Sequence, residues 1–161
     1  MDKKTAIKAV IKELERQKTG LETGLRSAER AAVEAPGAME SHSDTTKAQM
    51  HTLAANITEL IAENDRTMKY LDGLPIDEPE KRNEIKEGTL VKIKTEEGNE
   101  GNYFLIPDGS GGISVDIGGE SITLITAKTP LGSILLGKKT GETAVLKNKS
   151  GERAMKILDI S

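Results

Sequence analysis

The residues best suited to chemistry lie in a short polar segment, residues 35–47, between two long stretches of helical pattern. Glu40 and Asp44 are four residues apart in this segment, with His42 between them. Two neighbouring carboxylates could supply ligands to Mg²⁺, which prefers hard oxygen donors. The alternative is structural, because Ser41-x-x-Asp44 also fits the capping pattern of a helix start. Both interpretations stay open for the two carboxylates.

The composition excludes several other kinds of site. The 161 residues contain no cysteine, which excludes disulfides, thiolate zinc sites and cysteine nucleophiles. Both histidines, His42 and His51, fall in the helical half, so no Ser-His-Asp arrangement is credible. We interpret His42 as a solvated or partner-contacting residue, because no second histidine lies nearby to share a metal. Only 2% of residues are aromatic and the net charge is −3, which argues against base stacking and autonomous duplex binding.

The first half of the chain carries the heptad pattern of a two-stranded coiled coil. It predicts one helix from about residue 2 to 34, ending before Pro36, and a second from about residue 43 to 72. The short tip, residues 35–43, makes the two helices antiparallel neighbours. The predicted seam of the second helix comprises Met50, Leu53, Ile57, Leu60, Asn64, Thr67, Leu71 and Leu74.

The second half has a different composition and predicts strands. Twelve of the 16 glycines fall in residues 88–161, among valine, isoleucine and threonine, which indicates short strands separated by turns. Pro130 and Gly137 bracket a short apolar stretch and predict a short helix across the sheet. The domains are therefore a hairpin over residues 1–74, a linker over 75–87 and an α+β domain over 88–161. The predicted strands are 89–95, 102–106, 122–127, 143–148 and 153–160.

One stretch of the second half resembles a known family. Residues 122–142 read ITLITAKTPLGSILLGKKTGE, and the chain ends in the strand-like Ile157-Leu158-Asp159-Ile160. This order of strand, Thr-Pro-Leu, short helix, Leu-x-Gly-Lys turn and final hairpin resembles the C-terminal signature of the bacterial Gre transcript-cleavage factors, the GreA/GreB family. The order of the whole chain, a helical hairpin and then a β-rich domain, extends the resemblance to nearly full length.

The absence of cysteine, of a signal-peptide pattern and of an apolar run long enough to span a bilayer predicts a cytoplasmic protein. The resemblance implies a regulator of transcription elongation that binds bacterial RNA polymerase. It implies an FKBP-like antiparallel β domain that docks at the rim of the secondary channel, while the coiled coil carries its tip to the active site. The implied docking residues are Pro130, Leu131, Gly137, Lys138 and Lys139. The chain would be an accessory factor and no enzyme, a monomer without a membrane partner. It would meet RNA and DNA only within the elongation complex.

The tip departs from the family pattern. Cleavage-competent members carry a D-x-x-E-N-type acidic motif that helps to hold a second Mg²⁺ in polymerase. Residues 35–47 lack that motif, and Glu40, His42 and Asp44 are the nearest candidates. The resemblance thus implies no cofactor of the chain's own and, at most, a Mg²⁺ shared with polymerase through Glu40 and Asp44. The alternative function is a non-cleaving or inhibitory Gre-like regulator that occupies the channel.

Three rival functions are weighed against this one. A prolyl isomerase site needs a cup of aromatic rings, and the second half offers only Tyr103 and Phe104. An adaptor like the short-hairpin Rnk group would have shorter arms than the roughly 30 residues expected here. A self-pairing coiled-coil dimer is disfavoured by the polar seam positions and the loop between the two helices.

Overall fold

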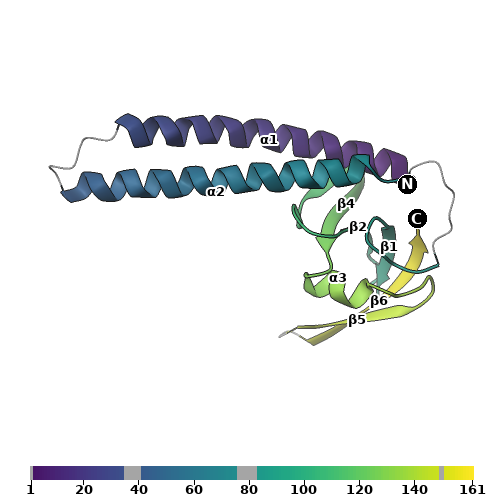
Figure 1. Cartoon of the computed structure of the whole chain (residues 1–161). Helices are drawn as coiled ribbons and strands as arrows, with labels where there is room; N and C mark the ends of the chain where they lie inside the picture. Colours follow the sequence, from purple (N-terminus) through teal and green to yellow (C-terminus); the bar gives the residue numbers. More distant parts are fainter. Residues whose placement is uncertain (1, 35–40, 76–82, 149–150) are drawn as a thin grey trace. The chain divides into compact units, whose positions relative to one another are not determined.

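The computed structural model describes residues 2–34, 41–75, 83–148 and 151–161, with the backbone alone for residues 41–45 and 148. Two long helices are followed by a β-rich half with one short helix, as Figure 1 shows. The expected α+β class is therefore confirmed. The elements are α1 (Lys3–Glu34), α2 (Ser41–Asp72), β1 (Leu90–Thr95), β2 (Glu100–Ile106), β3 (Ser114–Ile117), β4 (Glu120–Thr126), α3 (Pro130–Leu135), β5 (Thr143–Asn148) and β6 (Gly151–Ile160).

The described chain divides into two compact units. One contains Met1–Ile11 and Thr67–Ser161, and the other contains Lys12–Arg66. Each long helix therefore contributes residues to both units. The linker predicted over residues 75–87 stays a prediction, and its residues 76–82 lie outside the described part of the chain.

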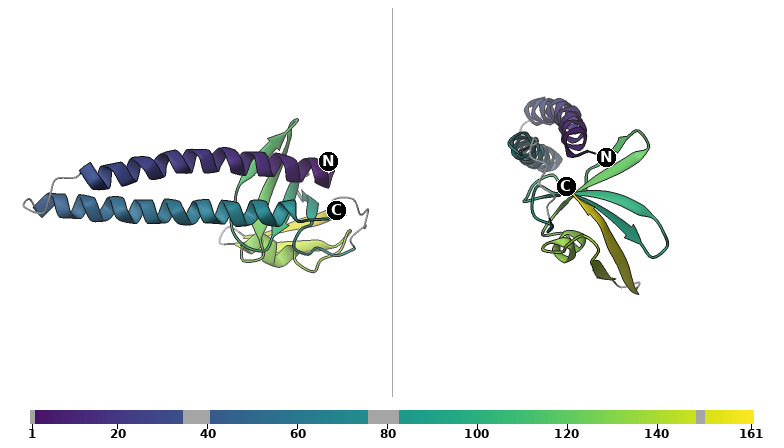
Figure 2. Two further views of the ribbon diagram at one scale, coloured as in Figure 1. Left: turned by 45° about the horizontal axis from the view of Figure 1, so that its top comes forward. Right: turned by 90° about the vertical axis from the view of Figure 1, so that its right-hand side faces the viewer.

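Helix α1 starts where its sequence provides a cap. The Thr5 backbone N–H donates to Asp2 Oδ1 at 2.9 Å, and the Thr5 hydroxyl donates to Asp2 Oδ2 at 2.6 Å. These hydrogen bonds satisfy a free N–H of the first turn and lower the pKa of Asp2. Helices α1 and α2 lie side by side in both views of Figure 2, as the antiparallel hairpin prediction requires.

The unit Lys12–Arg66 is held together by a narrow seam. Leu14, Ala28 and Ala32 of α1 are buried, and so is Asn64 of α2. Lys18 of α1 forms an ion pair across the hairpin, because its Nζ donates to both carboxylate oxygens of Asp65 at 2.7 and 2.9 Å. That bond raises the pKa of Lys18.

Two predicted seam residues lie outside this seam. Leu53 is 44% exposed and Leu60 is 47% exposed, so their assignment to the seam was wrong. Ile57, midway between them, faces α1 instead, and a Cβ at Gly24 would lie 3.7 Å from its Cδ1. Gly24 and Ala28 are small residues, so α1 presents little side-chain surface to cover further α2 side chains at this level.

The β-rich half forms one six-stranded sheet in the order β3-β4-β2-β1-β6-β5. Most neighbours are antiparallel, as predicted, but β2 and β4 are parallel, with Phe104 opposite Leu124. Between β2 and β4 in the sequence lies β3, which pairs antiparallel with β4 through the two-residue turn Gly118-Gly119. Because β3 takes up the reversal of chain direction, β4 runs parallel to β2. The sheet is therefore mixed, and β3 is a strand that the sequence analysis did not predict.

The sheet buries side chains on both faces. One core contains Val91, Leu105 and Ile125 of the central strands, and Leu131, Ile134 and Leu135 of α3 pack in this cluster. On the opposite face the alternating residues Phe104, Ile122 and Leu124 are also fully buried. The last turns of α2 belong to this unit, and the Ser110 backbone N–H donates to Thr67 Oγ1 at 3.2 Å.

Candidate functional site

The first candidate site is the start of α2, where the sequence places an acidic pair. Glu40 lies outside the described residues, so only its position in the sequence is known. Ser41 is the first residue of α2, so the helix begins two residues earlier than predicted and includes His42 and Asp44. Asp44 thus falls in the first turn, where a carboxylate would complement free N–H groups. Both the capping and the Mg²⁺ interpretation stay predictions.

The second candidate site is built on α3 and on the turn that follows it. Thr129 caps the helix, because its Oγ1 accepts a hydrogen bond from the Gly132 backbone N–H at 3.1 Å. The same hydroxyl donates to the Thr126 carbonyl at 2.7 Å, which ties the helix start to the end of β4. Pro130 stands at the first helical position, where its missing N–H costs no helical hydrogen bond. The Thr-Pro-Leu sequence therefore fixes α3 at the end of this strand.

The turn after α3 is held by the backbone of Ile85, whose side chain is buried. The Gly137 N–H donates to the Ile85 carbonyl at 2.9 Å, and the Ile85 N–H donates to the Lys138 carbonyl at 2.8 Å. Gly137 adopts a φ of 79°, a left-handed conformation that favours glycine. The Lys139 N–H donates to the Glu142 carboxylate at 2.6 Å and so closes the following turn. Three hydrogen bonds thus hold the backbone that carries the two lysines.

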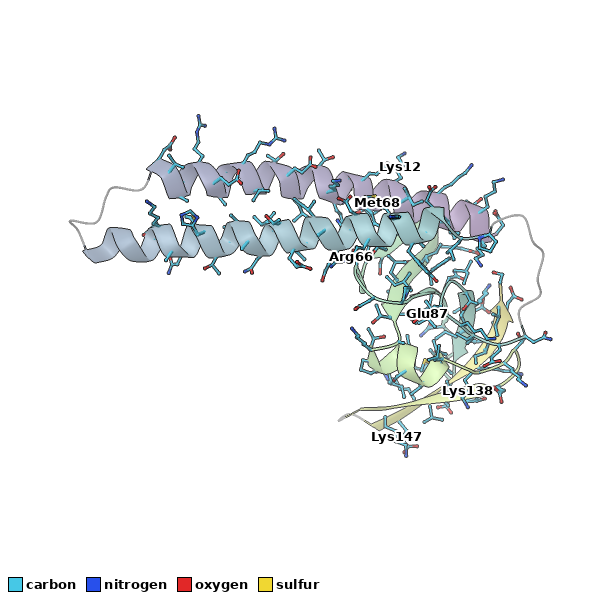
Figure 3. All side chains as sticks on the ribbon, in the orientation of Figure 1. Lys12, Arg66, Met68, Glu87, Lys138 and Lys147 are labelled. Atoms are coloured by element: carbon cyan, nitrogen blue, oxygen red, sulfur yellow. The ribbon has the colours of Figure 1, made fainter. Side chains whose placement is uncertain are left out.

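The side chains of this site face solvent to different degrees. Pro130 and Lys139 are exposed, Leu131 and Lys138 are half-buried, and Leu136 is 46% exposed. Figure 3 labels Lys138 on the turn after α3. In the part of the chain that the structure describes, neither lysine ammonium forms an ion pair. We define Pro130, Leu131, Leu136, Lys138 and Lys139 as the α3 surface.

The α3 surface offers binding chemistry. An exposed leucine beside two unpaired ammonium groups suits a partner that presents an apolar contact and carboxylates. Within residues 2–34, 41–75, 83–148 and 151–161, no group of three or more histidine and acidic side chains could hold a metal ion. No helix there is both long and apolar enough to cross a membrane.

Sequence reasoning proposed some of the residues on α3 and its turn as polymerase contacts, and that role stays a prediction. It proposed Pro130, Leu131, Gly137, Lys138 and Lys139, which the structure brings together in one short helix and its turn. It did not single out the exposed Leu136, nor Ile85 and Glu142 as the groups that hold the turn. Glu142 had a local signal, since it lies three residues after Lys139, whereas Ile85 is distant in sequence and had none.

The fold and the site define a class of protein. They give a helical hairpin and a mixed-sheet α+β domain that presents exposed residues on α3 and its turn. Residues 79–161, just over half of the 161 residues, match the family model described as "Transcription elongation factor, GreA/GreB, C-term". The chain belongs to this family and is a Gre-family transcription elongation factor. Its β-rich half is the family's FKBP-like C-terminal domain.

The chain is also similar, at low sequence identity, to solved structures. GreA factor homolog 1 (Gfh1) of Thermus thermophilus is 19% identical, with a TM-score of 0.40, and 96% of each chain is covered. Gfh1 of Thermus aquaticus is 20% identical over 95% of this chain and 94% of that chain, with a TM-score of 0.41. A GreA/GreB factor from Nitrosomonas europaea is 22% identical over 61% of this chain and 78% of that chain, with a TM-score of 0.38. A search of curated proteins gives no match.

Proposed function

We propose that this chain binds bacterial RNA polymerase as a monomer and modulates elongation from within the secondary channel. The observation that carries the proposal is the family match of residues 79–161. The hairpin fits the same role, because each arm has 32 residues. At 1.5 Å per residue, an arm is about 48 Å long, which suits a probe that reaches into a deep pore.

In this proposal the α3 surface docks at the channel rim. Its backbone is held by the hydrogen bonds of Thr129, Ile85 and Glu142, so the surface is largely formed before binding. A preformed surface loses little conformational entropy when it binds. Lys138 and Lys139 contribute electrostatic complementarity toward carboxylates of the polymerase, and Leu136 contributes the apolar contact.

The hairpin tip carries the finer part of the proposal, the stimulation of transcript cleavage. Glu40 and Asp44 would supply carboxylate oxygens to a Mg²⁺ held by the polymerase, and His42 would contact polymerase or RNA beside them. The metal would activate water for hydrolysis of backtracked RNA. The chain's own part would be to place the two carboxylates and to balance the charge of the ion.

A second candidate function is a regulator that occupies the channel without cleavage. The sequence of residues 35–47 favours it, because the segment lacks the acidic D-x-x-E-N-type motif. In such a protein Asp44 would serve as a capping residue in the first turn of α2. The effect on elongation would then come from obstruction of the channel.

The test is an assay on purified core polymerase and a stalled, backtracked complex. Binding is measured first by pull-down, and the release of RNA 3′ fragments is measured on the same complex. We expect binding, and fragment release faster than in buffer for a cleavage factor. Binding without faster release would support the non-cleaving regulator, and absence of binding would overturn both functions.

Matched variants assign any cleavage to the tip. Glu40→Ala/Asp44→Ala removes the two candidate carboxylates, and Glu15→Ala/Glu29→Ala removes two exposed carboxylates of α1. If the tip acts on Mg²⁺, the first variant loses cleavage and keeps binding, while the second keeps both. Equal cleavage by all forms would show that the tip carboxylates have no part in hydrolysis.

A further inference from the structure

Strand β5 has one side that no other strand of the described chain covers. It is the last strand of the sheet, and its neighbour there is β6 (Figure 1). An edge strand presents a row of backbone N–H and C=O groups that can pair with a further strand. None of the α3-surface residues belongs to β5. The open side of this strand therefore has no part in the function proposed above.

A bulge at the start of β5 shows how the strand is bonded to β6. The Gly141 N–H donates to the Ile157 carbonyl at 2.9 Å, and the Ile157 N–H donates to the Glu142 carbonyl at 2.9 Å. Gly141 has a φ of 87°, in the left-handed region. These are the features of a G1 bulge, in which the glycine is the extra residue. Glu142 and Ile157 are therefore a hydrogen-bonded pair of the ladder.

Alternation along the ladder then divides the residues of β5 into two sets. Hydrogen-bonded pairs recur at every second residue of an antiparallel pair. Ala144 lies two residues after Glu142 and so exchanges its backbone hydrogen bonds with β6, and Leu146 follows in the same way. The residues between them direct their backbone groups to the open side. We call these three the β5 edge: Thr143, Val145 and Lys147.

The side chains of the β5 edge share one face of the sheet, because side chains alternate along a strand. All three are exposed, and Val145 in the middle is 40% exposed. Lys147 has its charge balanced within its own hairpin, since its Nζ lies 2.8 Å from Glu152 Oε1. The edge thus presents a β-branched apolar residue between a threonine and a neutralised lysine.

The β5 edge is complementary to itself when two copies run antiparallel. With Val145 opposite Val145 of the second copy, Thr143 lies opposite Lys147 in both directions. This is the register in which all three residues of each edge find a partner. It sets two β-branched side chains against each other and places no like charges opposite one another, both of which favour a cross-strand pair.

The other edge of the sheet, β3, is less suited to such pairing. The Leu124 N–H donates to the Ile113 carbonyl at 2.8 Å, so alternation leaves Ser114 and Asp116 facing outward. Strand β3 has four residues, and it offers two outward residues where β5 offers three. One of the two is Asp116, a residue type that is depleted in strands. The observations therefore favour β5.

We propose that β5 pairs with β5 of a second copy of this chain, which joins the two sheets edge to edge. Each residue of the β5 edge exchanges both of its backbone hydrogen bonds with its partner. The contact uses the same patch on both copies, so it closes at two. It buries little area and belongs to the weak, transient interfaces below about 1,200 Å². The pairing is a property of the free chain and leaves the α3 surface uninvolved.

The first experiment is sedimentation equilibrium of the full chain from low micromolar to millimolar concentration. We expect the average mass to rise from that of the monomer toward that of the dimer. Val145→Pro removes an N–H that faces the open side, so it blocks pairing and spares the bonds to β6. Asp116→Pro makes the matched change on β3.

Val145→Pro should stay monomeric over this range, and Asp116→Pro should associate as the parent does. A parent that stays monomeric throughout would overturn the proposal. Association of Val145→Pro to the same extent as the parent would also overturn it, and so would an equal loss in both variants.

A single introduced thiol tests the register independently of the proline variants. The chain has no cysteine, so Val145→Cys carries one thiol per copy. A hydrogen-bonded antiparallel pair places two Cα atoms about 5.5 Å apart, within the range that a disulfide spans. With oxidised glutathione, Val145→Cys should form a covalent dimer roughly tenfold faster than Asp116→Cys, because pairing holds its two thiols at a high effective concentration. Equal rates would indicate random collision and would overturn the register.

Discussion

Gly132 lies so close to Thr126 that an added Cβ at position 132 would overlap the Thr126 carbonyl oxygen. The same carbonyl accepts the hydrogen bond of the Thr129 hydroxyl at 2.7 Å. Helix α3 is therefore seated on the end of β4 with no room for a side chain at this point. Pro130 begins α3 and Leu136 follows its last residue, so this close approach also fixes the positions of these two α3-surface residues.

Gly132→Ala should destabilise the C-terminal domain by about 1–3 kcal/mol, the usual cost of overpacking a tight site. The added methyl group would overlap backbone atoms of Thr126, which cannot move aside by a change of side-chain rotamer. Urea unfolding measures the change as a lower midpoint. Ser133→Ala, at an exposed position of the same helix, should stay within about 0.5 kcal/mol of the parent. An unchanged midpoint for Gly132→Ala would contradict the close approach.

Gly20→Ala and Gly24→Ala should each stabilise the hairpin by about 0.5–1 kcal/mol, because alanine loses less backbone entropy in a helix. An added Cβ at Gly20 meets nothing within 4 Å, and at Gly24 it makes ordinary contact with Ile57. Thermal unfolding followed by helical circular dichroism should show a higher midpoint.

The matched control for these helix variants is Gly98→Ala. Position 98 is equally open, but its φ of 89° strains any L-residue. Gly98→Ala should therefore lower the stability of the β-rich unit. A loss of stability at position 20 or 24 would show that these glycines serve a need of the hairpin that the contacts do not reveal.

The sequence predicts the hairpin and α3 well, because local signals set them. Pro36 marks the end of α1, and Pro130 and Gly137 bracket α3, each through a backbone restriction that acts within a few residues. The two-residue turn Gly118-Gly119, with a positive φ at both positions, was a further local signal. It is typical of a tight hairpin and would have predicted β3.

The rest of the fold depends on partners that are distant in the chain. Thr67 reads as a weak polar position in a seam, yet it is buried and bonds to Ser110, 43 residues away. The parallel pairing of β2 with β4 leaves no trace in either strand's own pattern. At the candidate site, the Ile85 backbone bonds to the turn at 137–138 and its side chain packs in the core. Such contacts are products of the tertiary fold.

The hairpin should be sensitive to acid through Glu13. Hydrogen bonds from Arg16, and next from Gln17, lower the pKa of Glu13 from 4.5 to about 2. A carboxylate whose pKa is lower in the folded state contributes stability above its unfolded pKa and loses it as the pH falls through the folded one. The contribution should therefore be present above pH 4.5 and be lost as the pH falls through about 2.

Arg16→Ala should move the pKa of Glu13 back toward its ordinary value, because it removes the leading cause of the shift. Titration of the ¹³C-labelled side-chain carboxyls by NMR measures the value directly. Arg30→Ala is the control, since Arg30 pairs with Glu34 in the same helix. A Glu13 titration that is the same in Arg16→Ala and the parent would disprove the assigned cause.

Polymerase binding should depend on the two lysines of the α3 surface. Their backbone groups, and not their ammonium groups, hold the turn, so Lys138→Glu/Lys139→Glu should fold normally. Lys94 and Lys156 are exposed cross-strand neighbours in β1 and β6, so Lys94→Glu/Lys156→Glu makes the same change of net charge elsewhere on the domain. Fluorescence anisotropy with labelled core polymerase compares the two.

The α3-surface variant should bind roughly tenfold more weakly, since two favourable charge contacts become repulsive. The loss should appear mainly as slower association and should shrink at high salt, because exposed charges are screened within about 10 Å at moderate ionic strength. The control pair should bind within about twofold of the parent if position matters more than net charge. Equal losses from both pairs would mean that polymerase senses only the domain's overall charge, and the docking surface would then have to be sought elsewhere on the domain.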